Sequence, residues 1–375
     1  MIKTIFLNLA LLVLKIIYAF IKIFPTENKI TFISRQSNKP SVDIKLLSEA
    51  LKKSLPNYKI VVLSKKIDDG LINKICYCFH IIKQMYHIAT SKIVILDSYC
   101  ISISVLNHKK NLKVIQMWHA IGLLKKAGYS IVNKTEGRKQ TLAKTLKMHN
   151  NYDYILVSSD NLRKPFQKVF NCSNSQLITL PLPRVDLLKN KKYHENNCIK
   201  IFEEYPIMKD KKNILYVPTF RKNEDCHQNK IYELISNVNF EEYNLIIKLH
   251  PLSKIKIENN NVINDNKFSS IEMISACDFV ISDYSTIIYE AAIAKKPLFF
   301  YAFDKDNYKG NRGFFINYEK EMPGLISGDS KEIITAIENQ NFNLRKVNQF
   351  LNKYVDMKFK SCTDEIVKFI RKNLK

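Results

Sequence analysis

Short apolar runs rich in isoleucine and valine alternate with longer amphipathic stretches, and this alternation constrains the fold more than any other feature. Buried parallel strands read as continuous apolar runs, and the amphipathic stretches between them read as crossover helices. The sequence therefore predicts an α/β fold with parallel sheets, with its clearest helices near 41–54, 71–90 and 160–170. The expected strands are residues 29–34, 59–64, 92–98, 112–119, 152–159, 176–183, 213–220, 243–251, 261–265, 278–285 and 296–303.

The chain is long enough for two domains, because 375 residues exceed one small core. The second half repeats the pattern of the first, which predicts two doubly wound domains facing each other across a cleft that receives the strand ends. The polar segment 187–212 has weak periodicity and is the expected linker. The predicted divisions are a membrane-associating helix at 1–25, domains at 26–190 and 191–345, and a C-terminal helix at 346–375 that packs back on the first domain.

The composition narrows the classes of ligand. Lys and Arg number 59 against 35 Asp and Glu, which favours nucleic acid, anionic lipid or a polyphosphate substrate, although biased base composition also produces such an excess. With 8 glycines and no GxGxxG or GxxxxGK run, a standard phosphate loop is not expected.

Cys76, Cys78 and His80 are close together in the sequence, but no second pair of metal ligands follows them, so no metal site is expected. The scattered cysteines indicate reduced thiols in the cytoplasm.

The first 24 residues are strongly apolar, but two lysines interrupt them. Asn8, Lys15 and Lys22 are spaced by seven, so they fall on one helical stripe, which Tyr18 joins. This pattern predicts an amphipathic helix that lies in the membrane interface and ends at Pro25. An uncleaved signal anchor and a simple core helix remain alternatives.

Polar residues of catalytic and binding types stand where the predicted strands end. His119 and His250 each close a strand, one in each half of the chain. Ser285 and Thr286 open a predicted helix, where hydroxyls and free backbone N–H groups form a phosphate site; ordinary helix capping is the alternative. Glu290 lies one turn further along, within reach of a ribose hydroxyl.

Five motifs, taken in order, resemble the CDP-glycerol glycerophosphotransferase family, the teichoic acid primases and polymerases. They are QMWHAIGLLKKAG (116–128), YVPTFR (216–221), KLHP (248–251), SDYSTIIYE (282–290) and NRGFFINYEKEMPG (311–324). The chain departs from the family pattern at residues 120–122, at residues 181–186 and at Asn317. The first departure lies beside the expected acceptor side, whereas the donor-side motifs are intact.

The resemblance implies two Rossmann-like domains of the GT-B type. It also implies transfer of a polyol phosphate, first of all glycerol phosphate, from CDP-glycerol or CDP-ribitol to a hydroxyl of an undecaprenyl-diphosphate-linked or glycolipid acceptor, with release of CMP and without cofactor or metal. His119 then resembles the family's general base, a role that suits a neutral imidazole. With His250 as a second catalytic group, the residues expected to bind the CDP donor are Thr219, Arg221, Asp283, Ser285, Thr286, Glu290 and Arg312.

Two other functions remain open. A glycosyltransferase of the same fold would release UDP or GDP from a nucleotide sugar, and fold alone does not separate it from a CMP-releasing enzyme. A basic nucleic-acid-binding protein is less favoured, because no zinc-finger, helix-turn-helix or KH element stands out, and no nucleic-acid partner is expected. The basic charge and the N-terminal helix together predict a peripheral enzyme on the anionic cytoplasmic face of the cell membrane.

Overall fold

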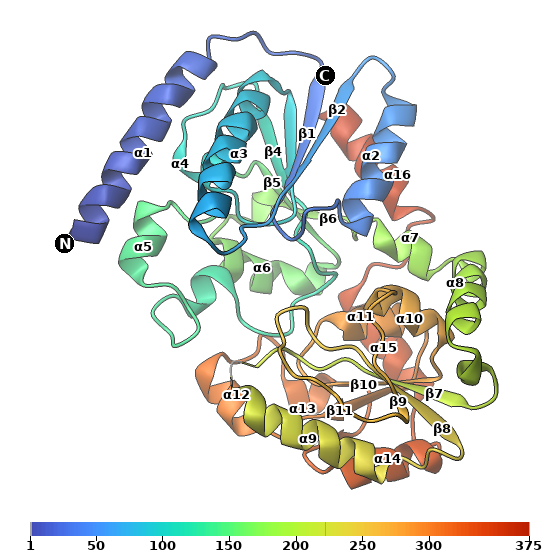
Figure 1. Cartoon of the computed structure of the whole chain (residues 1–375). Helices are drawn as coiled ribbons and strands as arrows, with labels where there is room; N and C mark the ends of the chain where they lie inside the picture. The colour runs from blue at the N-terminus through green and yellow to red at the C-terminus, as the bar shows by residue number, and fades with distance from the viewer. Residues whose placement is uncertain (1, 222, 375) are drawn as a thin grey trace. The chain divides into compact units, whose positions relative to one another are not determined.

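The computed structural model describes residues 2–221 and 223–374, so residues 1 and 375 of the predicted terminal segments lie outside the described residues. The chain forms two compact α/β units (Figure 1). The first unit contains the chain up to Ile121, residues 127–184 and the residues from Asp356 onward. The second unit contains residues 122–126 and 185–355.

The first unit is built on a parallel sheet with the strand order β2-β1-β3-β4-β5-β6. Both β1 and β3 are buried along their whole length, which is why they read as unbroken apolar runs. The strands are β1 Lys29–Ser34, β2 Lys59–Ser64, β3 Ile93–Leu96, β4 Lys113–Gln116, β5 Tyr154–Val157 and β6 Leu177–Thr179. The helices are α1 Ile2–Ile21, α2 Val42–Ser54, α3 Leu71–Thr90, α4 Ile101–Val105, α5 Gln140–Thr145, α6 Arg163–Phe170 and α16 Cys362–Lys372.

The second unit has a parallel sheet of its own, with the order β12-β11-β10-β7-β8-β9. Its strands are β7 Lys212–Tyr216, β8 Tyr243–Ile247, β9 Val262–Ile263, β10 Phe279–Ser282, β11 Leu298–Tyr301 and β12 Ile326–Ser327. Its helices are α8 Lys191–Glu204, α9 Glu224–Asn237, α10 Ser270–Ala276, α11 Ile287–Ile293, α12 Lys305–Asn311, α13 Tyr318–Glu321, α14 Ser330–Glu338 and α15 Leu344–Tyr354, while α7 Arg184–Leu188 joins the units. The predicted α/β fold with parallel sheets is confirmed, and the short β12 was not predicted.

The strand order reverses once in each sheet. In the first unit the reversal lies between β1 and β3, and in the second unit it lies between β7 and β10. Open α/β sheets bind ligands beyond the carboxyl ends of the strands at such a reversal. The loops that follow these four strands are therefore where each unit is expected to hold a ligand.

The structure differs from two predictions about the connecting segments. The expected linker at 187–212 folds mostly as α8, capped by the Asn190 side chain. Its periodicity is weak because α8 buries only Asn197 and Ile201. The C-terminal residues form two helices and not one, and α15 belongs to the second unit. The predicted packing on the first domain is confirmed for α16, which contacts α2.

The N-terminal helix α1 packs on the first unit through a narrow stripe. Leu11 and Tyr18 are buried, and the Tyr18 hydroxyl donates to Nδ1 of His108 at 2.8 Å. Tyr18 therefore faces the protein, whereas Lys15 is exposed beside that stripe. No helix in the described ranges is long and apolar enough to span a bilayer. Contact of α1 with a membrane stays a prediction.

Candidate active site

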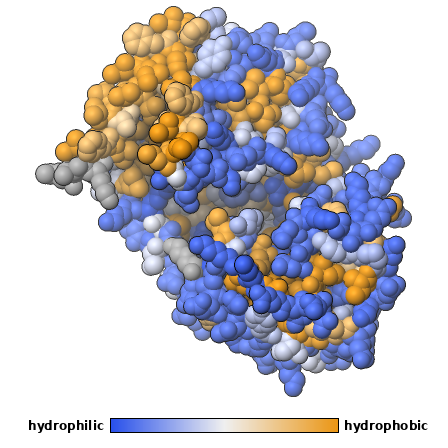
Figure 2. Space-filling view, viewed as in Figure 1, coloured by the Kyte–Doolittle hydropathy of each residue, from blue (hydrophilic) through white to orange (hydrophobic). Residues whose placement is uncertain are grey.

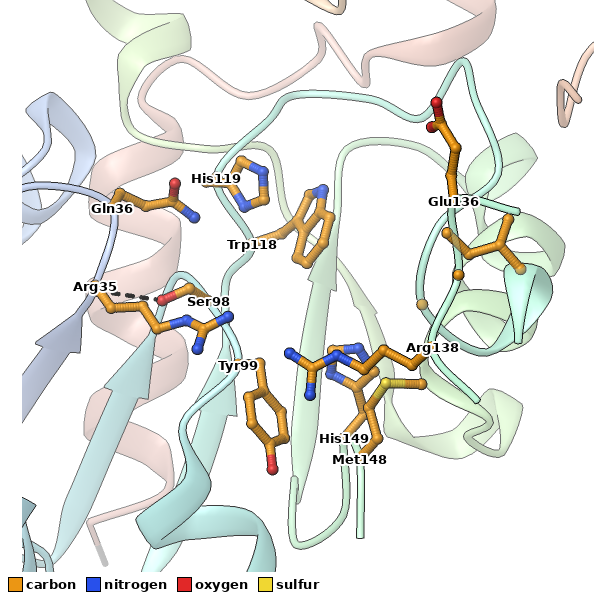
Figure 3. Close-up of a pocket in the computed structure, with 13 residues that line it drawn as sticks. Arg35, Gln36, Ser98, Tyr99, Trp118, His119, Glu136, Arg138, Met148 and His149 are labelled. Carbon is orange, nitrogen blue, oxygen red and sulfur yellow. Dashed lines mark hydrogen bonds between the residues drawn. The ribbon is translucent and has the colours of Figure 1, made fainter. Parts of the chain in front are cut away.

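A cavity of about 240 Å³ lies at the strand reversal of the first unit, beyond the ends of β1 and β3 (Figure 3). We call it the His119 cavity. Loops after β1, β3 and β4 form one part of its wall, and the segment that follows residue 127 forms the other. The lining residues are Arg35, Gln36, Ser98, Tyr99, Trp118, His119, Gly128, Ile131, Glu136, Gly137, Arg138, Met148 and His149.

A sharp turn after β4 brings His119 to the cavity. Trp118 has a left-handed backbone with φ of 63°, and its amide donates to Oε1 of Gln116 at 2.9 Å. Nδ1 of His119 lies 3.1 Å from the carbonyl oxygen of Asp97. Because a carbonyl oxygen only accepts, Nδ1 carries the proton, and Nε2 is the basic nitrogen of the neutral ring.

The surroundings of His119 keep its ring neutral. The side chain is exposed to water in the cavity, although protein atoms surround it on its other sides. Desolvation by these atoms lowers the pKa of His119, and the positive charges of Arg184 and Arg35 lower it further, against the opposing hydrogen bond to Asp97. At pH 7 the imidazole is therefore a neutral base.

A buried ion pair supports the turn that carries His119. Nε of Arg184 donates to Asp43 at 2.8 Å, and Nη2 of Arg184 donates to the backbone oxygen of His119 at 3.1 Å. Asp97 lies beside this pair, and burial followed by the nearby charge of Asp43 raises the pKa of Asp97 to about 6. The sequence reasoning missed Asp43 and Asp97; the position of Asp97 directly after a strand was the available signal.

In the second unit, three strand-end loops are joined by what we call the Arg221 cluster. Thr219 and Arg221 follow β7, Asp283 follows β10, and Asp304 follows β11. The Thr219 amide and hydroxyl donate to Asp283 at 2.9 and 2.7 Å. The Arg221 guanidinium contacts Asp283 at 2.8 Å and Asp304 at 2.7 Å, and its side chain is 9% exposed. Arg221 is therefore ion-paired with two carboxylates.

Other predicted donor residues surround the same strand ends. Ser285 accepts from the amide of Ile287 at 3.4 Å, and Thr286 directly precedes α11 without a capping bond from its side chain. Glu290 is buried at 3% exposure within α11. The Nε atom of Arg312 donates to the carbonyl oxygen of Lys126, 3.0 Å away.

His250 is exposed beyond β8 and stands close to Phe220, with 5.5 Å between the ring centroids. Its Nδ1 accepts from the Leu252 amide at 3.2 Å, so Nε2 carries the proton of the neutral ring. Partial burial and the charge of Lys125 lower the pKa of His250. Nε2 can thus donate one hydrogen bond to an anion.

The structure groups the predicted residues by unit. Thr219, Arg221 and Asp283 come together in the Arg221 cluster, whereas His119 belongs to the first unit. Among residues 2–221 and 223–374, no group of three or more His, Cys, Asp or Glu side chains could hold a metal ion. Sequence reasoning missed Asp304, Arg35 and Arg138, of which only Arg35, directly after a strand, carried a signal.

Comparisons of the sequence reveal close relatives. A family model described as CDP-glycerol:poly(glycerophosphate) glycerophosphotransferase matches residues 16–372. The teichoic acid ribitol-phosphate primase of Bacillus spizizenii is 30% identical over 354 residues, which cover 92% of this chain and 91% of that protein. The teichoic acid glycerol-phosphate primase of Bacillus subtilis is 31% identical over 379 residues, with 95% of each chain covered.

Solved structures share the fold. The wall teichoic acid polymerase TagF aligns with a TM-score of 0.77 at 20% identity, over 98% of this chain and 95% of that chain. A putative UDP-N-acetylglucosamine 2-epimerase from Listeria monocytogenes aligns with a TM-score of 0.62 at 13% identity, over 93% and 97% of the two chains. At such identities the likeness extends to the fold alone.

Proposed function

The chain belongs to the CDP-glycerol:poly(glycerophosphate) glycerophosphotransferase family, and we propose that its first unit holds the acceptor while its second unit holds the CDP donor. The enzyme transfers a polyol phosphate from a CDP-alditol in teichoic acid synthesis, as predicted. One observation supports this assignment of acceptor and donor to different units. Each unit gathers polar side chains at its own strand reversal, with a basic imidazole in the first unit and the Arg221 cluster in the second.

The proposed mechanism starts at His119. Its Nε2 takes the proton from the acceptor hydroxyl, and the hydroxyl oxygen attacks the β-phosphorus of the CDP-alditol. The bond between this phosphorus and the bridging oxygen breaks, and CMP leaves with that oxygen. The hydrogen bond from Nδ1 to the Asp97 carbonyl keeps the ring in the required tautomer and stabilises the imidazolium that forms.

The test of the reaction is a panel of donors. Purified enzyme is incubated with lipid-linked acceptor and with CDP-glycerol, CDP-ribitol, a UDP-sugar or a GDP-sugar, and the products are weighed by mass spectrometry. Release of CMP with a mass gain of one alditol phosphate is expected. Release of UDP or GDP with a hexose gain would instead establish the glycosyltransferase alternative.

The donor site is proposed to use His250 and the loop before α11, with the Arg221 cluster holding these loops in place. His250→Ala should weaken CDP binding about tenfold and lower kcat, because a phosphate loses a charge-assisted hydrogen bond. Ser285→Ala should have a smaller effect, since backbone N–H groups remain. Calorimetric titration with CDP measures both. The control is His194→Gln, which changes a histidine that is hydrogen-bonded to Ser275 in the same unit. Unchanged CDP affinity in His250→Ala would contradict the assignment of His250 to the donor site.

A membrane surface is the proposed location of the acceptor. Figure 2 shows a continuous hydrophobic area where α1 and α3 lie in Figure 1, and the two helices pack together. We call it the α1–α3 face. Its exposed apolar residues are Ile5, Phe6, Leu9, Leu12, Val13, Ile16 and Phe20 of α1, and Leu71, Ile72, Ile75, Phe79 and Ile82 of α3. Exposed apolar area of this extent, in a chain with a formal charge of +24, fits the interface of an anionic bilayer.

Replacing Phe6 or Phe79 with glutamate should lower binding to anionic vesicles by about tenfold or more, because burial of a phenylalanine contributes about 1.5–3 kcal/mol. Both side chains are 68% exposed, so the fold should be unaffected. Cosedimentation with phosphatidylglycerol vesicles measures the binding. Ile199→Glu is the matched control, since Ile199 is 58% exposed on α8 in the second unit. An equal loss in the control, or none in the two Phe variants, would contradict the α1–α3 face.

A further inference from the structure

Two arginines that the reaction scheme has not used meet in the His119 cavity. Arg35 follows β1, and Arg138 comes from the segment beyond residue 127. Each guanidinium carbon lies 5.5 Å from the ring centroid of Tyr99, and both side chains are half-buried. Figure 3 shows the two side chains pointing toward each other over this ring. The fold thus brings two like charges together in a partly desolvated place.

No carboxylate balances these charges within the described part of the chain: neither guanidinium has an acidic partner there. Glu136 also lines the cavity, but Figure 3 shows its carboxylate directed away from both guanidinium groups. His149, which also lines the cavity, adds no positive charge. Burial and the charges of Arg138 and Arg35 lower its pKa to about 3. Convergent, unpaired guanidinium groups in a cavity are the arrangement that recognises phosphate.

The backbone holds Arg138 in this position. Gly128 has φ of 56°, and a Cβ added there would meet the carbonyl oxygen of Val169 at 2.3 Å. A Cβ on Gly137 would meet the carbonyl oxygen of Ile131 at 1.6 Å. The segment is therefore packed against α6 at Gly128 and folded tightly on itself at Gly137, which fixes the backbone next to Arg138.

We propose that Arg35 and Arg138 form a subsite for a phosphate group of the acceptor, next to the base that activates the acceptor hydroxyl. The inference rests on the proposed function for the identity of the acceptor. The cavity volume of about 240 Å³ suits a phosphate or diphosphate with a short polyol and is below the roughly 300–1,000 Å³ of pockets that enclose larger ligands such as a whole nucleotide. The α1–α3 face also belongs to the first unit, so an acceptor held at a membrane would enter on this unit.

The chain carries its own reporter for this subsite. It contains a single tryptophan, Trp118, which lines the cavity with its ring centroid 4.2 Å from that of His119. Titration of the intrinsic fluorescence with sodium pyrophosphate or glycerol 3-phosphate, at constant ionic strength, therefore follows binding without turnover. The wild-type protein should show a saturable change.

Arg35→Met and Arg138→Met should each weaken this binding about tenfold, the loss of one charge-assisted hydrogen bond. Arg163→Met is the matched control: Arg163 belongs to the first unit, lies outside the cavity and contacts Asp160 at 3.6 Å. Circular dichroism checks that each variant is folded. A wild-type signal that does not saturate, or equal affinity in all variants, would overturn the inference.

Steady-state kinetics separate the acceptor from the donor as the source of the phosphate. In both cavity variants the KM for the acceptor should rise about tenfold while the KM for the CDP-alditol stays unchanged. A rise confined to the CDP-alditol KM, or displacement of pyrophosphate by CMP, would overturn the acceptor assignment. Failure of the wild-type enzyme to use any CDP-alditol would contradict the proposed function, a result distinct from either fluorescence outcome.

Discussion

Replacing His119 with alanine is expected to lower kcat by about 10²–10⁴-fold, the usual contribution of a positioned general base. Affinity for CDP should stay near the wild-type value, because His119 belongs to the first unit and the proposed donor residues to the second. Single-turnover CMP release, combined with calorimetric CDP binding, measures both quantities. The polar control His119→Gln should show the same loss, since glutamine can hold hydrogen bonds but cannot take the proton. A variant that turns over at the wild-type rate would remove His119 from the mechanism.

The pH dependence of the wild-type rate gives an independent check. Protonation of Nε2 abolishes the base, so kcat should fall as the pH decreases through the pKa of His119. Since burial and two arginines lower that pKa, the acidic limb should lie below pH 6.5, the ordinary value for histidine. The residual rate of His119→Ala should lack this limb; if the limb persists there, another group titrates.

Replacing Arg221 with alanine is expected to destabilise the second unit by about 3–5 kcal/mol, because it leaves two carboxylates without their cation. For a unit of this size, this corresponds to a loss of about 6–20 °C in the unfolding midpoint. Differential scanning calorimetry measures the shift. The control is Lys191→Ala in the same unit: Lys191 and its partner Glu195 are both exposed, so this change should alter stability by less than about 1 kcal/mol. Equal small effects in both variants would contradict the structural role of the Arg221 cluster.

The same variant should respond to pH with a defined sign. In the wild-type protein, burial alone would raise the pKa of Asp304, but the hydrogen bond and charge of Arg221 outweigh it and lower that pKa. This stabilisation is present above the unfolded pKa of about 4 and is lost as the pH falls through the lower folded value. Without Arg221, burial is no longer outweighed, and the pKa of Asp304 rises above the unfolded value. The deficit of the variant should therefore be largest at neutral pH and shrink on acidification.

Prediction from the sequence succeeded where the signal is local. Every strand predicted from an apolar run is present in the structure, because a buried strand must be apolar along its own length. The same rule put His119 and Arg221 at strand ends, the part of an α/β sheet that faces ligands. It failed for α8, whose two buried residues leave almost no periodic pattern.

Contacts between segments that are far apart in the chain could not be predicted from local sequence patterns. The pairing of Arg221 with Asp304 depends on β7 and β11 ending at the same edge of one sheet. From its sequence alone, Arg221 is an arginine available to a phosphate; in the folded unit it is held by two carboxylates. Likewise, α3 reads as an ordinary apolar helix, and only its packing against α1 reveals that their exposed sides form one face.

The sequence by itself determined the fold class, the strand positions and the reaction class, because hydrophobic periodicity and ordered motifs are properties of consecutive residues. Only the tertiary structure decided which charges are paired. Arg184 and Arg221 are neutralised by buried carboxylates, whereas Arg35 and Arg138 meet over Tyr99 without one in the described chain. The physical reason is that an ion pair depends on distances of a few ångströms between segments far apart in the chain, and these distances are set by strand order and loop packing.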